Sequence, residues 1–419
     1  MAGAVLGAGL ALRERSLRDG DTGAYSDDVP VAGAPLAPLP GSGFLIGANY
    51  EGPADRSWAM WAEGRFDAAL IETDFGRATD AGLGALRIFV QEPLAGRIEA
   101  GEWQPLDIVM DLAERRGLGL IVALADYRVE ALNALAGTAT AIARRYADHP
   151  ALRGYDLRNE PRVGDLITAL YPDGPIRLQS AAALEHYGAL IPRDSALAWR
   201  AGQPSWLPAR LSDDEAHWTI TTLLAMDHLQ AESRDWIAER PGATVLEYLD
   251  EPEARVRWSP LVGLIDSGLR RWMGVQTSAI RAFDQQHPIM VGYNDPLLAS
   301  LPANRLLDLV SFHHYLPPDD AAPAYMASVA SQIGARVERP VLLGEFGWST
   351  AEVPAERAAE LEVESFRVAR RAGLAGGLKW MLNDAANQPD AREAAFGMYR
   401  ADGTAKAVVA AMRGLTGFS

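Results

Sequence analysis

The chain has 419 residues, 48% of them hydrophobic and 22% charged, which is enough apolar material for a large core and excludes a disordered chain. Its 39 basic and 55 acidic side chains give a formal net charge of -16. Because this charge repels phosphate backbones and anionic lipid surfaces, we expect no nucleic-acid partner. The sequence contains no cysteine, which excludes disulfides, thiolate metal sites and a cysteine nucleophile.

The N-terminal segment Met1–Leu12 is apolar, but it is short and follows no basic residue, so it is a poor signal peptide. Residues 1–43 end in a stretch rich in Ala, Pro and Gly, and we expect them to form a tether before the first strand. No later stretch approaches the roughly 20 apolar residues that a membrane-spanning helix needs. The sequence therefore predicts a soluble chain, secreted or cytoplasmic, and leaves its oligomeric state open.

From Phe44 onward, short apolar runs alternate with longer amphipathic segments, which is typical of parallel strands joined by helices. Eight such units predict a closed (β/α)8 TIM barrel over residues 44–419. An open doubly wound sheet is the alternative, but Gly47–Gly52 lacks the glycine-rich phosphate loop that such a sheet usually carries. The predicted strands are Phe44–Asn49, Ala85–Val90, Gly119–Ala125, Leu152–Leu157, Ile289–Tyr293, Leu309–His313, Val341–Glu345 and Gly377–Met381.

Two of the predicted helices have clear apolar stripes. Apolar residues recur at helical spacing within Leu106–Ala113, and Gly117, which follows two arginines, predicts the end of that helix. A similar stripe runs over Leu269–Phe283 and ends before Pro288.

The regular spacing breaks once, between Glu160 and a helix near Ile265. We interpret residues 163–260 as a large, mostly helical insertion after the fourth strand. It leaves the C-terminal end of that strand, and barrel enzymes hold their reacting groups on that face. Most of its tryptophans are expected to build the core of this subdomain; they are Trp199, Trp206, Trp218, Trp236 and Trp258.

Several strand ends carry clustered polar and aromatic residues that a purely structural barrel does not need. Cleavage of an acetal requires a proton for the leaving group and a negative charge beside an oxocarbenium-like transition state, so two carboxyls are the minimum equipment. Glu160, after the fourth strand, and Glu345, at the end of the seventh, are the candidate pair. A separation of roughly 5 to 5.5 Å between their carboxyl groups would imply retention of anomeric configuration.

Five features of the sequence together resemble the cellulase-like glycoside hydrolase family 5, within the clan of retaining barrel glycosidases. They are Asn159-Glu160-Pro161, His313-x-Tyr315, Gly344-Glu345-Phe346-Gly347, Trp380 and Arg87. The resemblance runs from about Phe44 to the C-terminus, excluding the insertion. It implies a retaining β-glycosidase acting on gluco- or manno-configured oligo- or polysaccharides, with no cofactor and no metal.

The resemblance also implies a role for each matching residue. Glu160 is expected to be the general acid and base, and Glu345 the nucleophile. Asn159 would bind the sugar 2-hydroxyl. Arg87 and Tyr315 would contact Glu345, with Arg87 holding that carboxyl ionised.

The remaining candidates would line the sugar site or its rim. His313 and Trp380 are expected to line the site, with the indole of Trp380 under the sugar ring. Trp348 is either a further sugar platform or a packed residue. Candidates for rim contacts are Asn49, Tyr50, Tyr293, Asn294 and Asp384.

The sequence departs from the family pattern on the third strand, where cellulase-like members commonly carry a histidine. This chain has Ala123-Leu124-Ala125-Asp126-Tyr127 there, and Asp126 is the candidate substitute. Plain cellulase activity is therefore in doubt.

Two other functions remain open from the sequence. A carbohydrate-binding barrel without catalysis is one, although both glutamates are present. A metal enzyme using His313, His314 and a carboxylate is the other; adjacent residues of a strand face opposite sides, which argues against a shared ion.

Overall fold

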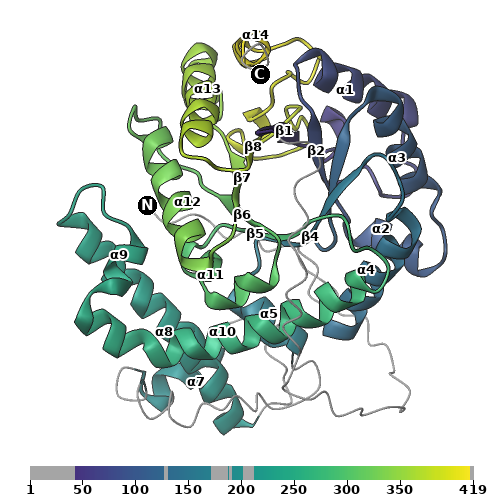
Figure 1. The fold of residues 1–419 in the computed structure, drawn as a ribbon. Helices are drawn as coiled ribbons and strands as arrows, with labels where there is room; N and C mark the ends of the chain where they lie inside the picture. The colour runs from purple at the N-terminus through teal and green to yellow at the C-terminus, as the bar shows by residue number, and fades with distance from the viewer. Residues whose placement is uncertain (1–42, 127–130, 171–186, 188–190, 202–211, 416–419) are drawn as a thin grey trace. The chain divides into compact units, whose positions relative to one another are not determined.

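The computed structural model describes residues 43–126, 131–170, 187, 191–201 and 212–415. Eight parallel strands close into a barrel in the order β1 to β8, which confirms the predicted (β/α)8 fold (Figure 1). Each predicted strand overlaps an observed one. The strands are β1 (Leu45–Asn49), β2 (Ala85–Phe89), β3 (Gly119–Ala123), β4 (Leu152–Asn159), β5 (Ile289–Tyr293), β6 (Val310–His313), β7 (Val341–Phe346) and β8 (Gly376–Lys379).

Helices surround the barrel (Figure 1). Those outside the segment between β4 and β5 are α1 (Ala68–Asp80), α2 (Glu92–Glu99), α3 (Gln104–Arg116), α4 (Leu132–Tyr146), α11 (Pro296–Ala299), α12 (Ala322–Val337), α13 (Ala355–Arg371) and α14 (Ala407–Arg413). Short 3-10 helices are η1 (Ala54–Arg56), η2 (Pro302–Leu306) and η3 (Glu393–Ala395). The helix α3 ends as the sequence predicts, because Gly117 adopts the left-handed conformation with φ 67°.

Alternate side chains of the strands build two apolar cores, one between the strands and the helices and one inside the barrel. Leu120 and Val122 of β3 belong to the main core between strands and helices. Ile121, between them, faces the barrel interior and belongs to a separate buried cluster with Met290, Leu309, Leu342 and Leu378. This interior layer is a packed floor beneath the polar strand ends.

Irregularities in the strands decide which side chains face the barrel mouth. In a regular strand, residues three positions apart face opposite sides. Asp156 and Asn159 nevertheless both bond to Arg87, because the register of β4 against β5 shifts between them. The register of β7 shifts in the same way against β6 and β8, which brings Glu345 to the interior although Leu342 already faces it.

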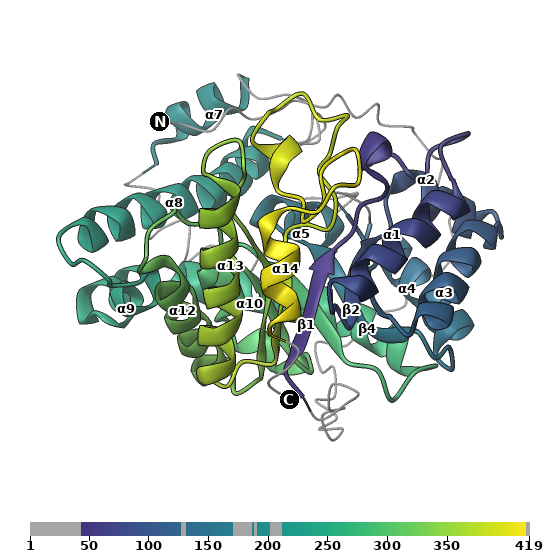
Figure 2. The same ribbon diagram turned by 90° about the horizontal axis from the view of Figure 1, so that it is seen from above.

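The described residues between β4 and β5 form α5 (Val163–Leu170), α7 (Arg193–Ala201), α8 (Asp213–Ala238), α9 (Val245–Asp250) and α10 (Pro252–Arg281). The helices α7, α8 and α9 gather on one side of the barrel (Figure 1). In the turned view, α5 and α7 lie toward the end to which the β1 arrow points (Figure 2). The helix α10 runs through residue 260 without a break and carries Pro260 inside it, so inserted segment and barrel helix are continuous.

Trp258 is fully buried and Trp236 packs against the same core, as expected for residues that build the insertion. The side chains of Trp199, Trp206 and Trp218 lie outside the described residues, as do Tyr127 and the predicted tether before Gly43. The predicted stripe of α10 is buried except at Phe283, which lies beyond the helix end and is 41% exposed under the guanidinium of Arg144. Within the described part of the chain, no helix combines the length and apolar character that crossing a membrane requires.

Candidate active site

The C-terminal ends of four strands bring the two glutamates and their nearest partners together. Arg87 comes from β2, Glu160 follows β4, His313 ends β6 and Glu345 lies in β7. One carboxyl oxygen of Glu160 and one of Glu345 lie within 4.8 Å of each other and of a ring nitrogen of His313. Two glutamates 185 positions apart in the chain therefore face one another across a small space.

Glu345 is held by three neighbours. Its Oε1 accepts a hydrogen bond from Arg87 Nη1 at 2.7 Å, and its Oε2 accepts one from the Tyr315 hydroxyl at 2.7 Å. Burial raises the pKa of Glu345 above its usual value, and Glu160 adds to this, while His313, Arg87 and Tyr315 lower it. Arg87 thus lowers the pKa of Glu345, as predicted, but burial raises that pKa by more. Both carboxyl oxygens are fixed in place.

Gly344 permits this approach of β7 to β6. A Cβ atom at position 344 would lie 1.9 Å from the hydroxyl oxygen of Ser311 and 2.9 Å from the His313 ring. With any larger residue, the side chains of Ser311 and His313 or the strand that carries Glu345 would have to shift. The glycine before the glutamate is therefore a packing requirement of the site.

Glu160 occupies a strained position at the end of β4. Its φ of 44° lies in the left-handed region, which is unfavourable for a residue with a side chain and is found at functional sites more often than elsewhere. Its Oε2 accepts a hydrogen bond from Asn294 Nδ2 at 2.9 Å. Burial raises the pKa of Glu160, while Arg87, Arg162 and Asn294 lower it, so the protonated form persists to higher pH than in an exposed glutamate.

His313 lies between the two glutamates. Its Nδ1 is 3.1 Å from Glu160 Oε1 and 3.3 Å from Glu345 Oε1. Burial lowers the pKa of His313 to about 4, so the ring is neutral at neutral pH. Because an ionised carboxylate only accepts, the neutral ring must carry its proton on Nδ1 to bond with Glu345. His313 can thus connect the two carboxyls without adding a full positive charge.

Arg87 is the centre of a buried network beneath the glutamates. Its Nε and Nη2 both donate to Asp156 Oδ2, at 2.9 and 2.6 Å, and Nη2 also donates to Asn159 Oδ1 at 2.8 Å. Nη1 donates to Asn49 Oδ1 at 3.0 Å as well as to Glu345. Asp156 was missed by the sequence analysis, although a charged residue in the middle of a buried strand is the signal that marks it.

Asn49 and Asn159 contribute to this network rather than to an open surface. Asn49 is fully buried, and its amide donates to the backbone carbonyls of Gly344 and Lys379, so the predicted rim contact is corrected to a support for Arg87. Asn159 is 1% exposed and donates to Asp126 Oδ1 at 3.1 Å. Among the described residues, only Asp126 accepts from this amide, so its second hydrogen can reach a ligand.

Asp126 and Glu51 add two further buried carboxyls. Asp126 accepts from Asn159 and from Gln91, and burial raises its pKa to about 6. Glu51 follows β1 and is 1% exposed; its Oε2 accepts from Ser57, and its Oε1 has no hydrogen-bond partner among the described residues. Burial, Asp126 and Glu345 raise the pKa of Glu51 well above its usual value. Glu51 escaped the sequence analysis, yet an acid within two residues of a strand end is the same signal that identified Glu160.

An aromatic wall closes one side of the site. The Trp380 ring lies 6.1 Å from the Phe89 ring and 6.3 Å from the Trp58 ring. Trp380 and Phe89 belong to one buried cluster, and Trp58 and Tyr315 pack against it. Trp58 is half-buried and has a φ of 63°, a second strained position at this end of the barrel. Trp348 is 5% exposed and packs in the main core, which places it among packed residues rather than sugar platforms.

The structure separates the remaining rim candidates. Asn294 contacts Glu160, as described above. Tyr50 and Tyr293 are buried, with hydroxyls that donate to Asp74 and Asn304, so they are corrected to core residues. Asp384 forms an ion pair with Lys406 at 2.6 Å.

The ligand atoms of Glu160, His313 and Glu345 are close enough together to hold a metal ion. However, the Glu345 oxygen that faces His313 already bonds to the Arg87 guanidinium at 2.7 Å, and a cation there would be repelled by that charge. His314 does not join the group, because its ring packs between Phe312 and Tyr325. The donor set therefore fits a hydrogen-bonded carboxyl pair better than an ion.

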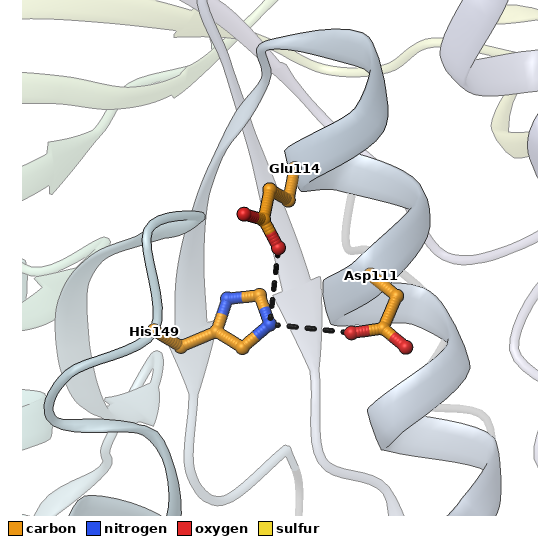
Figure 3. Close-up of side chains that lie close together, drawn as sticks. All are labelled: Asp111, Glu114 and His149. Atoms are coloured by element: carbon orange, nitrogen blue, oxygen red, sulfur yellow. Dashed lines mark hydrogen bonds and ion pairs between the residues drawn. The ribbon is translucent and has the colours of Figure 1, made fainter.

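A second group of possible ligands lies on α3 and the loop between α4 and β4 (Figure 3). His149 Nε2 is 3.4 Å from Asp111 Oδ1 and 3.9 Å from Glu114 Oε2. Its Nδ1 accepts the backbone N–H of Ala151, so the neutral ring carries its proton on Nε2 and donates toward the carboxylates. Both carboxylates are exposed, and the group is explained as a surface interaction.

The sequence matches no protein-family model, and no curated protein matches it significantly. Solved structures are similar in fold. A GH5_18 protein from Streptomyces cattleya in complex with GlcNAc shares 15% identity, with 90% of this chain and 81% of that chain covered and a TM-score of 0.57. A GH5_18 protein from Bifidobacterium longum subsp. infantis shares 14%, with 89% and 78% covered and a TM-score of 0.57.

An exo-beta-1,4-mannosidase from Opitutaceae bacterium strain TAV5 shares 18% identity, with 89% of this chain and 59% of that chain covered and a TM-score of 0.54. Because these sequence identities are low, the similarity to the three structures shows a shared fold only. The protein has the (β/α)8 barrel fold found in these structures.

Proposed function

We propose that this protein is a retaining β-glycosidase acting on gluco- or manno-configured saccharides, with Glu345 as nucleophile and Glu160 as general acid and base. The observation that carries the proposal is the separation of at most 4.8 Å between one carboxyl oxygen of each glutamate. Retaining glycosidases hold their carboxyls about 5 to 5.5 Å apart, and inverting enzymes hold them farther apart to admit a water.

In the first step, Glu345 attacks the anomeric carbon while Glu160 gives its proton to the departing oxygen. The carbon–oxygen bond to the leaving group breaks, and a glycosyl ester with Glu345 forms. In the second step, Glu160 takes a proton from water as the water oxygen attacks the anomeric carbon, and the ester bond to Glu345 breaks. Burial favours a protonated Glu160, and Arg87 and Tyr315 stabilise the ionised Glu345.

The surroundings of the pair support this assignment. Trp380 and Trp58 offer apolar faces for the C–H side of a pyranose. The likeness to structures described as a mannosidase and as a complex with GlcNAc favours a saccharide substrate.

Replacement of Glu345 by glycine tests the proposal on a panel of aryl β-glucosides and β-mannosides. We expect loss of turnover and, with added azide, formation of an α-glycosyl azide, because a small anion fills the space of the missing carboxylate. Release of aryl groups at the unmodified rate by Glu345→Gly would refute the nucleophile. A wild-type protein that releases no aryl group but melts at higher temperature with sugar would be a carbohydrate-binding barrel.

A further inference from the structure

The chain contains only two lysines, Lys379 and Lys406, although it has 39 lysine and arginine residues in total. Both are buried, Lys379 with 1% and Lys406 with 5% of its surface exposed. Lysine is almost never buried unless its charge is paired. All other positions of these two residue types carry arginine, so this chain keeps an ammonium group only at two buried places close to one another in the sequence.

Lys379 is the last residue of β8, and its ammonium group makes three contacts. Nζ donates to the backbone carbonyls of Trp380 at 2.9 Å and Phe396 at 2.7 Å, and it forms an ion pair with Glu362 Oε1 at 2.7 Å. Glu362 lies in α13 and is also buried. An ammonium group has three hydrogens, and these contacts use all of them. Lys379 thus joins β8, the chain at Phe396 and α13 at one point.

Lys406, the residue before α14, makes contacts of the same kind. Its Nζ donates to Asp384 Oδ1 at 2.6 Å, to Thr350 Oγ1 at 2.8 Å and to the backbone carbonyl of Ala395 at 2.8 Å. All three hydrogens of this ammonium group are used as well. Because Ala395 precedes Phe396 in the chain, the two lysines bind neighbouring carbonyls of one segment.

This segment, residues 380–397, begins with Trp380 and is called the β8 loop below. Both sides of the Trp380 peptide are fixed, because its N–H donates to the carbonyl of Phe346 in β7 and its carbonyl accepts from Lys379. Phe396, near the end of the loop, belongs to the same buried cluster as the Trp380 ring. The contacts of the two lysines therefore converge on the part of the loop that holds the Trp380 wall of the candidate site.

Gly347 explains why the contact of Lys379 needs a compact cation. A Cβ atom at position 347 would lie 2.5 Å from the carbonyl oxygen of Trp380 and 3.5 Å from Glu362 Oε1, so the acceptors of Lys379 are packed against β7. These acceptors surround a single nitrogen atom. The planar guanidinium of an arginine is larger and directs its donors as a fork, so it does not match this arrangement.

We propose that Lys379 and Lys406 are positioning residues of the candidate active site, which fix the β8 loop and through it the ring of Trp380. The proposal rests on the proposed glycosidase function and adds to it two residues that act without touching the substrate. The competing explanation is that both ion pairs stabilise the fold and have no separate effect on Trp380.

A double-mutant cycle with Trp380→Ala separates the two explanations. Lys406→Met keeps the aliphatic stem and removes the ammonium group. At a temperature at which all variants are folded, Lys406→Met should lower kcat/KM for an aryl β-glycoside about tenfold, but by less than about twofold in the Trp380→Ala background, because the ring that Lys406 positions is then absent. Equal losses in the two backgrounds would overturn the positioning role.

Two further variants complete the cycle. Asp384→Asn removes the partner charge of Lys406 at nearly equal size, and its effect should depend on Trp380 in the same way. Asp308→Asn is the matched control, because it breaks the partly buried ion pair of Asp308 with Arg281 outside the β8 loop. Its effect on kcat/KM should be the same with and without the Trp380 ring.

The rarity of lysine also permits a test that needs no turnover. After acetylation with an N-hydroxysuccinimide ester, cleavage at arginine places the two lysines in separate peptides, since Arg392 and Arg400 lie between them. In the folded protein, Lys379 should react at least about tenfold more slowly than in the denatured chain, because reaction requires local opening. Lys406→Met should increase this rate several-fold, and Asp308→Asn should not. An unchanged rate in Lys406→Met would refute a shared hold on the loop.

The two measurements together distinguish failure of this proposal from failure of the glycosidase function. If acetylation of Lys379 depends on Lys406 but the wild type hydrolyses no glycoside, the glycosidase function fails and the hold on the β8 loop stands. If glycosides are hydrolysed and Lys406→Met acts equally with and without the Trp380 ring, only the positioning role fails.

Discussion

Asp156 and Arg87 form an ion pair in which neither side chain is exposed, with Arg87 Nη2 2.6 Å from Asp156 Oδ2. Asp156 Oδ1 also accepts the backbone N–H groups of Gly292 and Arg158, so the aspartate joins β4 to β5 while it orients the guanidinium. The pair leaves Nη1 of Arg87 for Glu345. A residue with no contact to a substrate thus fixes the cation that supports the proposed nucleophile.

Replacement Asp156→Asn should therefore alter both stability and pH dependence. Loss of one partner of a buried ion pair costs about 3 to 5 kcal/mol of unfolding free energy. Without Asp156, the Arg87 charge acts more strongly on Glu345 and lowers the pKa of that carboxyl, so the acidic limb of the pH profile should move to lower pH. Chemical denaturation and a pH–rate profile measure the two effects. Asp111→Asn, at a 60% exposed carboxylate, is the control and should change stability by roughly 0 to 1 kcal/mol.

The pH profile of kcat/KM should be bell-shaped and displaced upward. The pKa of both Glu345 and Glu160 is raised by burial, and activity requires Glu345 ionised and Glu160 protonated. Activity should therefore rise as Glu345 loses its proton and fall as Glu160 loses its own, with both limbs above the pH range of exposed carboxyls. Because the two carboxyls interact, the two apparent pKa values of the profile describe the pair together and cannot be assigned to one glutamate each.

Glu160→Gln should remove the alkaline limb of this profile. For an alkyl glycoside, which needs an acid, the rate should fall roughly 10²- to 10⁴-fold. For a nitrophenyl glycoside, whose leaving group needs little protonation, the fall in formation of the glycosyl-enzyme should be small. A pre-steady-state burst of nitrophenol measures this step. An alkaline limb that persists in Glu160→Gln would show that another group is the acid.

Glu51→Gln should stabilise the protein at neutral and alkaline pH. The folded-state pKa of Glu51 is raised, so its ionisation opposes folding once the pH exceeds the value of the unfolded chain, and the penalty is complete above the folded-state pKa. The amide carries no charge, so the melting temperature of Glu51→Gln should exceed that of the wild type at pH 8, and the difference should shrink as the pH falls. Glu63→Gln, at an exposed glutamate, should show no such trend. Equal melting curves at all pH values would indicate that a partner compensates the Glu51 charge.

Asp284 should have the opposite pH dependence. Burial would raise the pKa of Asp284, but hydrogen bonds from His287, Tyr155 and two backbone N–H groups outweigh it and hold the pKa well below its usual value. A depressed folded-state pKa adds stability above the unfolded-state value, and this stability is lost as the pH falls. Asp284→Asn should therefore lower the unfolding free energy by about 1 to 3 kcal/mol at pH 7 and by less near pH 3. Denaturation curves at the two pH values measure this loss of unfolding free energy. An equal loss at pH 7 and pH 3 would contradict the depressed pKa of Asp284.

The fold could be predicted from the sequence because its signals are local. Each strand is a short apolar run, and each crossover helix has a stripe of apolar residues, so order and period suffice to identify eight units. Glu160 and Glu345 were found in the same way, since each follows a strand whose end must lie at the barrel mouth. Phe283 shows that helical spacing does not locate the end of a helix. Its position fitted the apolar stripe, but α10 ends at Arg281.

The tertiary structure decided how those residues meet. Strand irregularities in β4 and β7 turn Asn159 and Glu345 toward Arg87, and no local pattern reports a register shift. Burial sets the pKa directions of both glutamates and depends on every element around the barrel mouth. The sequence by itself determined that Glu160 and Glu345 reach the barrel mouth, because strand ends are encoded locally. Their separation was decided only by long-range packing, which joins segments that no sequence spacing relates.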